Sequence, residues 1–483
     1  MRRLAGLCAI LPLALVVAGC GGTTSTGTGG AGIVPASAPA YIAINTDPDS
    51  SQWQTVDDLV KRFPSQGKAR KVFHQALNQA GVSWENDIKP ALGKEFDFIW
   101  LDFRNDGQDF VALTQPKNEA KFEELFSKDE TSDFFHMKFR GWQVMAPSQE
   151  LLDRFRRESD SGDSLADKGS FKDAMDAYPS DMLLRAWVDG AAVMKEARKD
   201  PDPEFQKILP KLGSLDWVAV NLRVTSDGIR FDANVHGTPG PAFKGIKVTR
   251  PFRPSLQNVI PKDALLYTAF HGRPGMLTGL EKNALFKDVP ELHRYSKLLA
   301  HIESIVQGEN ALYVRAAGSG KIPEITFVAE PAPGTNSMKT LDGILNRYRT
   351  QLELPSLPKA VQVAGLPARQ LKNPPVTIYY ANVGKRFVIT DFPSGIRTLK
   401  GAPPASLGQS SEYRSALDSS GMPSQPQGFL YVNFHGGIKY AQRLAGTPIP
   451  GEVKRNLNPL RSAVEYAATR PSEIQITLFI RIK

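Results

Sequence analysis

The chain has 483 residues and a formal net charge of +9, and 41% of its residues are hydrophobic and 9% aromatic. This composition excludes a largely disordered chain, and the length predicts roughly two to four domains that each bury a core. The only cysteines are Cys8 and Cys20, so disulfides, thiolate metal sites and a cysteine nucleophile are excluded from everything after residue 20.

The first twenty residues have the pattern of a bacterial lipoprotein signal. Arg2 and Arg3 form a positive region, and Leu4–Val17 is mostly apolar but too short to span a bilayer. Val17-Ala18-Gly19-Cys20 then resembles a lipobox. We therefore expect a signal peptide at 1–19 and lipidation, by a palmitate-type acyl chain, at Cys20. The alternative is an ordinary secretory peptide that ends in cysteine.

This signal predicts a protein of the cell envelope, lipid-anchored on the extracytoplasmic face of a bacterial membrane. Residues 20–33 are rich in Gly, Thr and Ser and are expected to form a flexible tether. Twelve residues of this kind have a root-mean-square reach of about 20 Å. The folded part would therefore lie close to the head groups.

Short strands alternate with amphipathic helices from residue 34 to residue 238, which we expect to form a first α+β module. A helix follows from Trp53, Val56, Leu59 and Phe63 at helical spacing, and Pro64 ends it. Other helices are expected at 69–80, 119–126 and 150–157. Strands are expected at 41–45, 96–103, 110–114, 134–139, 142–146, 182–188, 217–224 and 229–235.

Residues 256–483 repeat this order and predict a second, related module after a proline-rich linker at 239–255. Tyr41 in AYIAI has a counterpart in Tyr267 in LLYTAF. The clearest match is between residues 170–176 and 412–418, and 218–224 match 476–482. The predicted fold is α+β, with two tandem modules that each have a mostly antiparallel sheet and helices packed on one side. The alternative is a chance similarity between two α+β segments of similar period.

No set of residues indicates catalysis or a cofactor. The seven histidines are scattered without a metal-binding spacing, and no GxxxxGK[ST] phosphate loop occurs. Gly318-Ser319-Gly320 lacks the preceding glycine of a nucleophile elbow. The pairs Asp57-Asp58 and Glu123-Glu124 lie on predicted helix surfaces. We therefore predict no catalytic, cofactor or metal residues, and a protein that is not an enzyme.

All six tryptophans lie in the first half of the sequence. They indicate either an aromatic cavity for an apolar or sugar ligand, or core aromatic residues that Phe and Tyr replace in the second half, as at Trp142 and Phe387.

The basic residues are interspersed with acidic ones, and the densest group runs from Lys61-Arg62 to Lys71. Beyond the membrane that holds Cys20, the expected partners are anionic lipids, envelope glycoconjugates or envelope proteins. Nucleic acid is not expected, because the chain has an export signal and lacks a basic and aromatic stripe.

Several motifs resemble a bacterial envelope family known as a domain of unknown function, DUF3352. They are PAxAxxYIAIN with DPDSSQW, a helix that ends in KRFP, and DIKPALGKEF. The resemblance is strongest over Val34–Leu113, and the segment around ALLYTAFHG repeats it more weakly. It implies an extracytoplasmic protein of actinobacterial type without an assigned activity, and it supplies no catalytic residues.

The sequence therefore predicts a membrane-anchored, non-enzymatic binding or scaffolding protein of the envelope. A scaffold predicts an exposed apolar or charged patch. The alternative is a carrier or sensor of lipid or glycolipid, which requires a continuous apolar cavity. A hydrolase of envelope polymers is the third candidate, and it would need carboxylates from both modules to meet.

Overall fold

The computed structural model describes residues 29–79, 81–127, 134–199, 202, 206–207, 209–211, 213–240, 249–281, 296–316, 322–401, 403–446 and 449–483. Below, the first half means the described residues up to 240, and the second half means those from 249. The predicted signal peptide, Cys20 and most of the predicted tether lie outside the described residues, as do residues 241–248 of the predicted linker.

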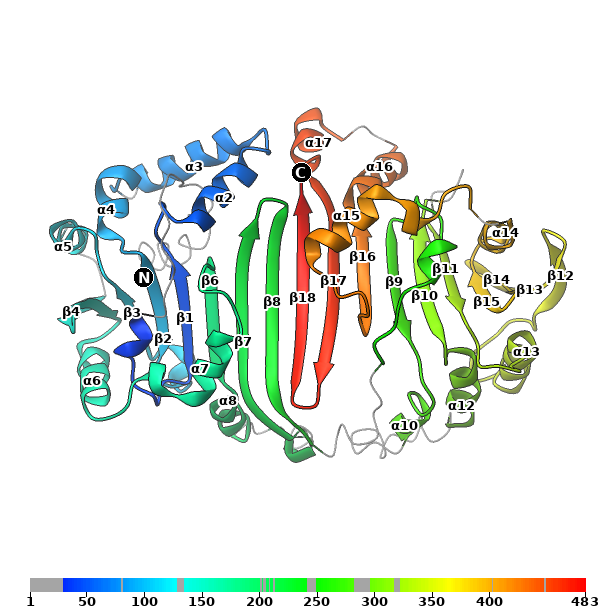
Figure 1. The fold of residues 1–483 in the computed structure, drawn as a ribbon, viewed down its shortest axis with the longest axis horizontal. Coiled ribbons are helices and arrows are strands. Elements are labelled where there is room, and N and C mark those ends of the chain that lie inside the picture. The colour runs from blue at the N-terminus through cyan, green and yellow to red at the C-terminus, as the bar shows by residue number, and fades with distance from the viewer. Residues whose placement is uncertain are drawn as a thin grey trace.

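The described strands form one sheet of 18 strands in which every pair of neighbours is antiparallel (Figure 1). The first half contributes β1 (Ala40–Asn45), β2 (Glu95–Trp100), β3 (Phe110–Thr114), β4 (Phe135–Phe139), β5 (Trp142–Ala146), β6 (Leu184–Asp189), β7 (Gly213–Thr225) and β8 (Gly228–Pro239). The second half contributes β9 (Leu266–His271), β10 (Glu309–Arg315), β11 (Glu324–Ala329), β12 (Lys359–Val363), β13 (Leu366–Asn373), β14 (Val376–Val383), β15 (Arg386–Thr390), β16 (Gly428–Asn433), β17 (Leu460–Arg470) and β18 (Glu473–Ile482).

The spatial order of the strands is β4-β5-β3-β2-β1-β6-β7-β8-β18-β17-β16-β9-β10-β11-β15-β14-β13-β12. Strands β8 and β18 join the two halves through a register that runs from Gly228↔Arg481 to His236↔Glu473. The α+β class and the antiparallel pairing are confirmed. The expectation of a sheet for each module is replaced by one continuous sheet, because β8 and β18 pair and thereby satisfy each other's edge groups.

The helices lie on both faces of the sheet, which corrects the prediction that they cover one side. They are α2 (Ser51–Val60), α3 (Gln66–Gln79), α4 (Lys89–Ala91), α5 (Glu119–Ser127), α6 (Gln149–Asp160), α7 (Gly169–Asp176), α8 (Gly190–Ala197), α10 (Thr278–Glu281), α12 (Ser296–Ile305), α13 (Ser337–Arg347), α14 (Pro393–Gly401), α15 (Ser411–Ser420), α16 (Phe434–Ala445) and α17 (Gly451–Leu457). On β7, Ala219 belongs to the core that contains Phe171 of α7, whereas Val224 belongs to the core that contains Trp53 of α2. Successive residues of a strand face opposite ways, and Ala219 and Val224 are an odd number of positions apart, so α7 and α2 cover opposite faces.

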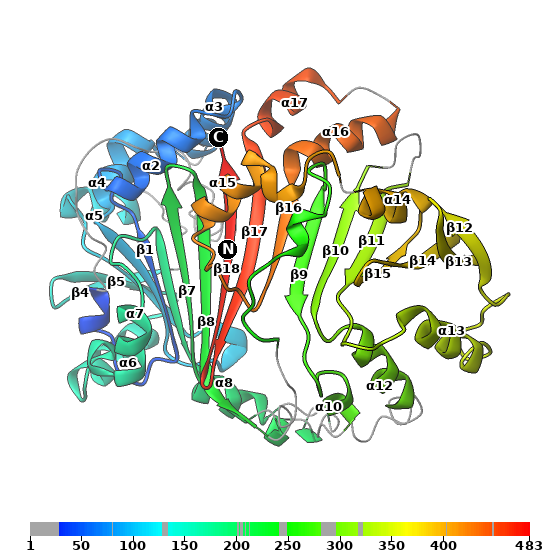
Figure 2. The same cartoon turned by 45° about the vertical axis from the view of Figure 1, so that its right-hand side comes forward.

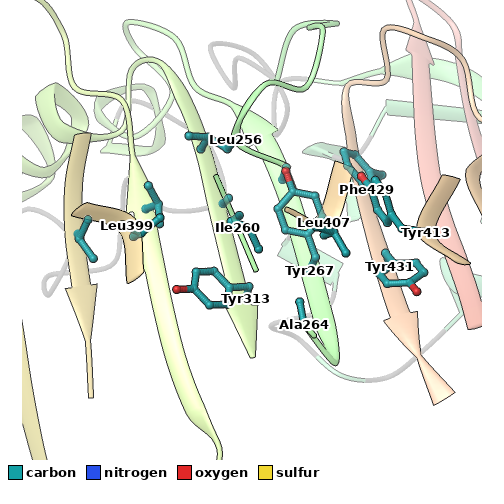
Figure 3. Packing of buried hydrophobic residues seen from close by; sticks show 14 of the residues in the cluster. Leu256, Ile260, Ala264, Tyr267, Tyr313, Leu399, Leu407, Tyr413, Phe429 and Tyr431 are labelled. Carbon is teal, nitrogen blue, oxygen red and sulfur yellow. The ribbon is translucent and has the colours of Figure 1, made fainter. Parts of the chain in front are cut away.

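Two large aromatic cores lie on the face that α7 and α15 cover. In the first half, the fully buried ring of Tyr41 meets Phe171 edge to face, with ring centroids 5.4 Å apart. In the second half, Tyr267 meets Phe429 in the same way, also at 5.4 Å (Figure 3). Figure 3 shows Tyr267, Tyr313, Phe429 and Tyr431 on the strands, and residues from helices, such as Leu399 and Tyr413, belong to the same core.

In the described part of the chain, no helix has both the length and the apolar character that crossing a membrane requires.

Candidate binding site

An apolar cavity of about 660 Å³ lies between α2, the start of α3 and the central strands of the sheet. Fifteen of its eighteen lining residues are hydrophobic: Ile44, Trp53, Val56, Leu59, Val60, Phe63, Ala69, Leu183, Leu184, Leu222, Val224, Ile229, Leu460, Ile480 and Ile482. The other three are Ser65, Gln66 and Asn456. The volume lies within the range of roughly 300–1,000 Å³ that is usual for small-molecule sites.

Helix α2 forms the roof of the cavity because its apolar side chains recur at helical spacing. The helix begins after Ser50, whose hydroxyl accepts a hydrogen bond from the Trp53 backbone N–H at 3.4 Å. Two further contacts fix the helix to the sheet. The Trp53 indole N–H donates to the Asn45 carbonyl at 2.8 Å, and the Gln52 side chain bonds both backbone groups of Val224. The roof is therefore held by hydrogen bonds as well as by apolar contact.

The floor of the cavity comes from strands of both halves. Leu222 and Val224 of β7 lie beside Ile229 of β8, which is opposite Ile480 of β18. The cavity therefore spans the junction where the two halves meet, and neither half forms it alone.

The polar lining residues gather at the rim between α3 and α17. Ser65 donates its backbone N–H to Asn456 Oδ1 at 2.8 Å, and the Asn456 side-chain amide donates to Ser65 Oγ at 2.6 Å. The Ser65 hydroxyl donates to Glu452 at 2.9 Å, and Lys68 pairs with the same carboxylate at 2.7 Å. These contacts close the rim by linking the two halves of the chain.

An apolar strip continues from the floor along the same face of the sheet. Residues 229, 231, 474, 476 and 480 share this face because they alternate along β8 and β18. Ile229 and Ile480 line the cavity, whereas Phe231, Ile474 and Ile476 are 39%, 45% and 38% exposed. The cavity thus passes into a partly open apolar surface.

A separate cluster of buried polar groups lies on the opposite face, in the first half. The Tyr41 hydroxyl donates to Asp97 at 2.9 Å and to Glu95 at 3.3 Å, and the Gly30 backbone N–H donates to Glu95 at 3.2 Å. Burial raises the pKa of Glu95, and it raises that of Asp97 further because the neighbouring Glu95 carboxylate adds to the effect. Burial lowers the pKa of Arg185 in the same cluster.

The second half builds the corresponding place with apolar residues. In the first half, Ala43 pairs with Asp97 on one side and Arg185 on the other, whereas Ala269 pairs with Ala311 and Phe429. Glu309 corresponds to Glu95 and accepts hydrogen bonds from the backbone N–H groups of Ser255 and Leu256. Both glutamates therefore hold the segment that precedes the first strand of each half, and the cluster is separate from the cavity.

The sequence predicted one site residue, Cys20, and its lipidation remains a prediction. Of the six tryptophans, Trp53 lines the cavity, while Trp142, Trp187 and Trp217 lie in the first aromatic core. The core alternative thus holds for these three residues, whereas a ligand-binding role for the tryptophans remains a prediction. The motif at 318–320 lies outside the described residues. Among the described residues, no group of three His, Cys, Asp or Glu side chains could hold a metal ion.

The predicted helix-surface carboxylates are indeed on helices and paired with cations. Asp57 binds Lys61 at 2.7 Å and Arg70 at 3.1 Å, and Glu124 binds Lys121 at 2.7 Å. The cavity residues themselves were not predicted. The alternation of isoleucines and leucine in β18, at 474, 476, 478, 480 and 482, was the signal for an apolar face, but it does not tell which helices leave that face uncovered.

Comparison with known proteins confirms the family resemblance over part of the chain. Residues 4–122 match the family described as "Protein of unknown function (DUF3352)". No match was found among curated proteins. Solved structures of TP0453 in crystal forms IV, I and III are similar at a TM-score of 0.23, with 10%, 8% and 9% identity. They cover 44%, 42% and 44% of this chain, and 83%, 77% and 80% of theirs.

Proposed function

We propose that the protein is a lipid-anchored, non-enzymatic binding protein of the cell envelope that holds an acyl chain of a lipid or glycolipid in the cavity under α2. The observation that carries this proposal is the cavity of about 660 Å³ with its almost wholly apolar lining. A lipid carrier or sensor requires such a space. The interior offers few polar groups, which favours a hydrocarbon ligand over a sugar.

Transfer of hydrocarbon from water accounts for the binding free energy. Each buried methylene contributes about 0.8 kcal/mol, so an acyl chain gains affinity in proportion to the length that the cavity accepts. The polar side chains Ser65, Gln66 and Asn456 lie at the rim. A ligand with one polar end would therefore lie with its chain inside and its head group at the rim.

The anchor part of the proposal rests on the lipobox at Cys20. A protein held near the membrane by Cys20 would have its ligand source within reach of its tether. The signal therefore supports a ligand drawn from membrane lipids or envelope glycolipids.

We also propose that the two halves arose by duplication and are tandem related modules. Outward from the β8–β18 junction, the order β8-β7-β6-β1-β2-β3-β5 in one half corresponds to β18-β17-β16-β9-β10-β11-β15 in the other. A local detail supports this correspondence. A side chain at Gly93 would lie 2.2 Å from the Gln115 carbonyl oxygen, and one at Gly308 would lie 2.3 Å from that of Glu330. Each glycine lets the backbone before the second strand approach the end of the third.

Filling the cavity tests the proposed function. Val60→Trp places an indole in the space, so binding of the fluorescent fatty acid cis-parinaric acid should weaken about tenfold or more. Val376→Trp makes the same change at a 47% exposed position on β14 and should leave binding unchanged. Thermal unfolding verifies that both variants fold. Equal binding by both variants would refute the cavity as the site, and native mass spectrometry of protein from the envelope would identify the natural ligand.

A scaffold remains a second candidate because of the exposed strip with Phe231, Ile474 and Ile476. An envelope protein could cover this surface. Crosslinking from position 476 in the intact envelope distinguishes the two, since a scaffold would give a protein adduct and the lipid-binding function a lipid adduct.

A further inference from the structure

We infer that α3, α16 and α17 together form a membrane-docking edge, which rests on an anionic lipid surface and brings the cavity rim against the bilayer. The docking itself does not depend on the proposed function. The passage of a ligand between the bilayer and the cavity does rest on the proposed function.

Positive charge is concentrated on these three helices. They contain seven Lys or Arg residues and one acidic residue, Glu452. The seven are Lys68, Arg70, Lys71, Lys439, Arg443, Lys454 and Arg455. The surplus of six charges is large beside the +9 of the whole sequence. Asp57 of α2 offsets one of these charges by pairing with Arg70.

Each helix of the edge also exposes an aliphatic side chain among its cations. Val72 on α3 is 64% exposed, Val453 on α17 is 47% exposed and Leu444 on α16 is 39% exposed. Exposed apolar side chains between Lys and Arg are typical of helices that lie in the interface of a bilayer. Single-stranded nucleic acid is instead bound with aromatic side chains on which bases stack. The combination on these helices therefore favours lipid.

The three helices lie at one end of the molecule. Figures 1 and 2, which differ by a rotation about the vertical axis, both show α3, α17 and α16 along the upper edge. The ion pair between Lys68 and Glu452 joins α3 to α17 at 2.7 Å. Ser65, just before α3, and Asn456 of α17 form the rim of the cavity. A bilayer in contact with this edge would thus meet the rim.

Electrostatic attraction and apolar contact act together at the surface of an anionic membrane. Each Lys or Arg near an anionic membrane strengthens binding about fivefold, and this gain falls off with ionic strength. The aliphatic side chains add contact with the hydrocarbon boundary, which a soluble polyanion does not offer.

The test compares two charge-matched triple variants in the full chain carrying Cys20→Ser, so that no acyl anchor contributes. All six substituted lysines are exposed and are replaced by Gln. The edge variant changes one lysine on each helix: Lys71, Lys439 and Lys454. The control variant changes three lysines of the second half that lie in or next to strands β12, β13 and β15: Lys359, Lys372 and Lys385.

Binding is measured by sedimentation with vesicles of phosphatidylglycerol and phosphatidylcholine, and with vesicles of phosphatidylcholine alone. The edge variant should bind the anionic vesicles on the order of 100-fold more weakly, and the control variant within about threefold of the parent. Equal losses in both variants would mean that only the net charge matters and would overturn the proposal. So would equal binding to the two kinds of vesicle.

A second pair of measurements separates lipid from other polyanions. Val72→Ser/Val453→Ser should weaken binding to anionic vesicles and leave binding to polyphosphate unchanged. An unchanged affinity for vesicles would show that the edge does not use its apolar side chains, and would overturn a membrane as the partner.

The docking edge and the cavity can fail separately. The edge variant should bind cis-parinaric acid like the parent, and Val60→Trp should bind anionic vesicles like the parent. Docking is supported if the edge variant loses vesicle binding while Val60→Trp still binds anionic vesicles like the parent. This conclusion holds even if the parent does not bind the fatty acid.

Discussion

At the level of single residues, Asp97 and Arg185 have no polar counterparts in the second half, although Glu309 takes the place of Glu95. Ala311 and Phe429 take the register positions of Asp97 and Arg185, and the surrounding sheet is the same. The fold therefore does not require a polar cluster at this place. In the first half, the cluster holds the segment at Gly30, because Glu95 accepts the Gly30 N–H.

The raised pKa of Asp97 predicts that stability depends on pH. A carboxyl whose pKa is higher in the folded state than in the unfolded state stabilises the fold at low pH, where it is neutral. The protein loses this stability as the pH rises from the unfolded pKa of the group toward its folded pKa. The unfolded value is about 4. Asp97→Asn keeps a donor and cannot ionise, so the fall in the free energy of unfolding above about pH 4 should become smaller. Denaturant unfolding across pH measures this effect.

Asp173→Asn is the matched control, because Asp173 is exposed on α7. It should leave the slope of stability against pH as in the parent. A slope that Asp97→Asn leaves unchanged would assign the pH dependence to other groups.

At the level of elements, α2 and α3 are held in very different ways. Helix α2 buries Gln52, Trp53, Val56 and Leu59, whereas α3 buries only Leu77 among its fourteen residues. The rim contacts between Ser65 and Asn456 join the start of α3 to α17. A helix with so little burial opens locally at low cost.

Removal of the rim contact should therefore loosen α3 without unfolding the protein. Asn456→Ala removes the side-chain bonds to Ser65, and we expect amide hydrogen exchange over residues 66–79 to increase severalfold. Global stability should fall by about 1 kcal/mol. Asn458→Ala, one exposed residue beyond α17, should leave exchange as it is. Exchange that responds to neither change would show that α3 is held by other contacts.

Much of the local structure could be predicted, because it follows from short-range patterns. Tyr41 to Asn45 became part of β1, and the apolar spacing from Trp53 marked α2, although the helix ends at Val60 and not at Phe63. The cavity could not be predicted. Its floor joins Leu222 to Ile480, which are far apart in sequence and meet only through the β8–β18 pairing.

The match between the halves was partly displaced for a similar reason. The sequence pairs residues 218–224 of β7 with 476–482 of β18, whereas under the proposed duplication the strand order makes β7 correspond to β17. The long strands of this region all alternate in the same way, so their pattern alone does not separate neighbours. The burial of Asp97 could not be predicted either, because a carboxylate at an alternating position of a strand normally indicates the solvent-exposed face.

At the level of the whole molecule, a partly buried arginine connects the halves. Arg230 of β8 pairs with Asp232 at 2.8 Å, donates to the Ser420 carbonyl at 2.8 Å and donates to the Tyr466 hydroxyl at 3.2 Å. Ser420 and Tyr466 belong to the second half. The side chains of Arg230 and Asp232 are 18% and 4% exposed, so this contact is shielded from solvent.

Arg230→Met should lower the free energy of unfolding by about 3–5 kcal/mol, because it leaves the Asp232 carboxylate buried without its partner. Arg230→Met/Asp232→Leu should lose less, since no charge is then stranded. Arg470→Gln breaks an ion pair whose arginine side chain is 72% exposed, and it should change stability by no more than about 0.5 kcal/mol. Denaturant titration compares the three. Equal losses for Arg230→Met and Arg470→Gln would contradict a structural role for the junction.

The position of β18 also has a consequence for biogenesis. This strand comes after every other strand in chain order, yet it lies between β8 and β17 in the middle of the sheet. Until its ten residues have emerged, the first half keeps an open edge along β8, which could pair with another chain. If the proposed signal directs export of an unfolded chain, folding would begin only after export. The β8 edge would then be exposed to pairing with other chains only when β18 is also present to cover it. A chain that stopped before Glu473 would leave both β8 and β17 as open edges.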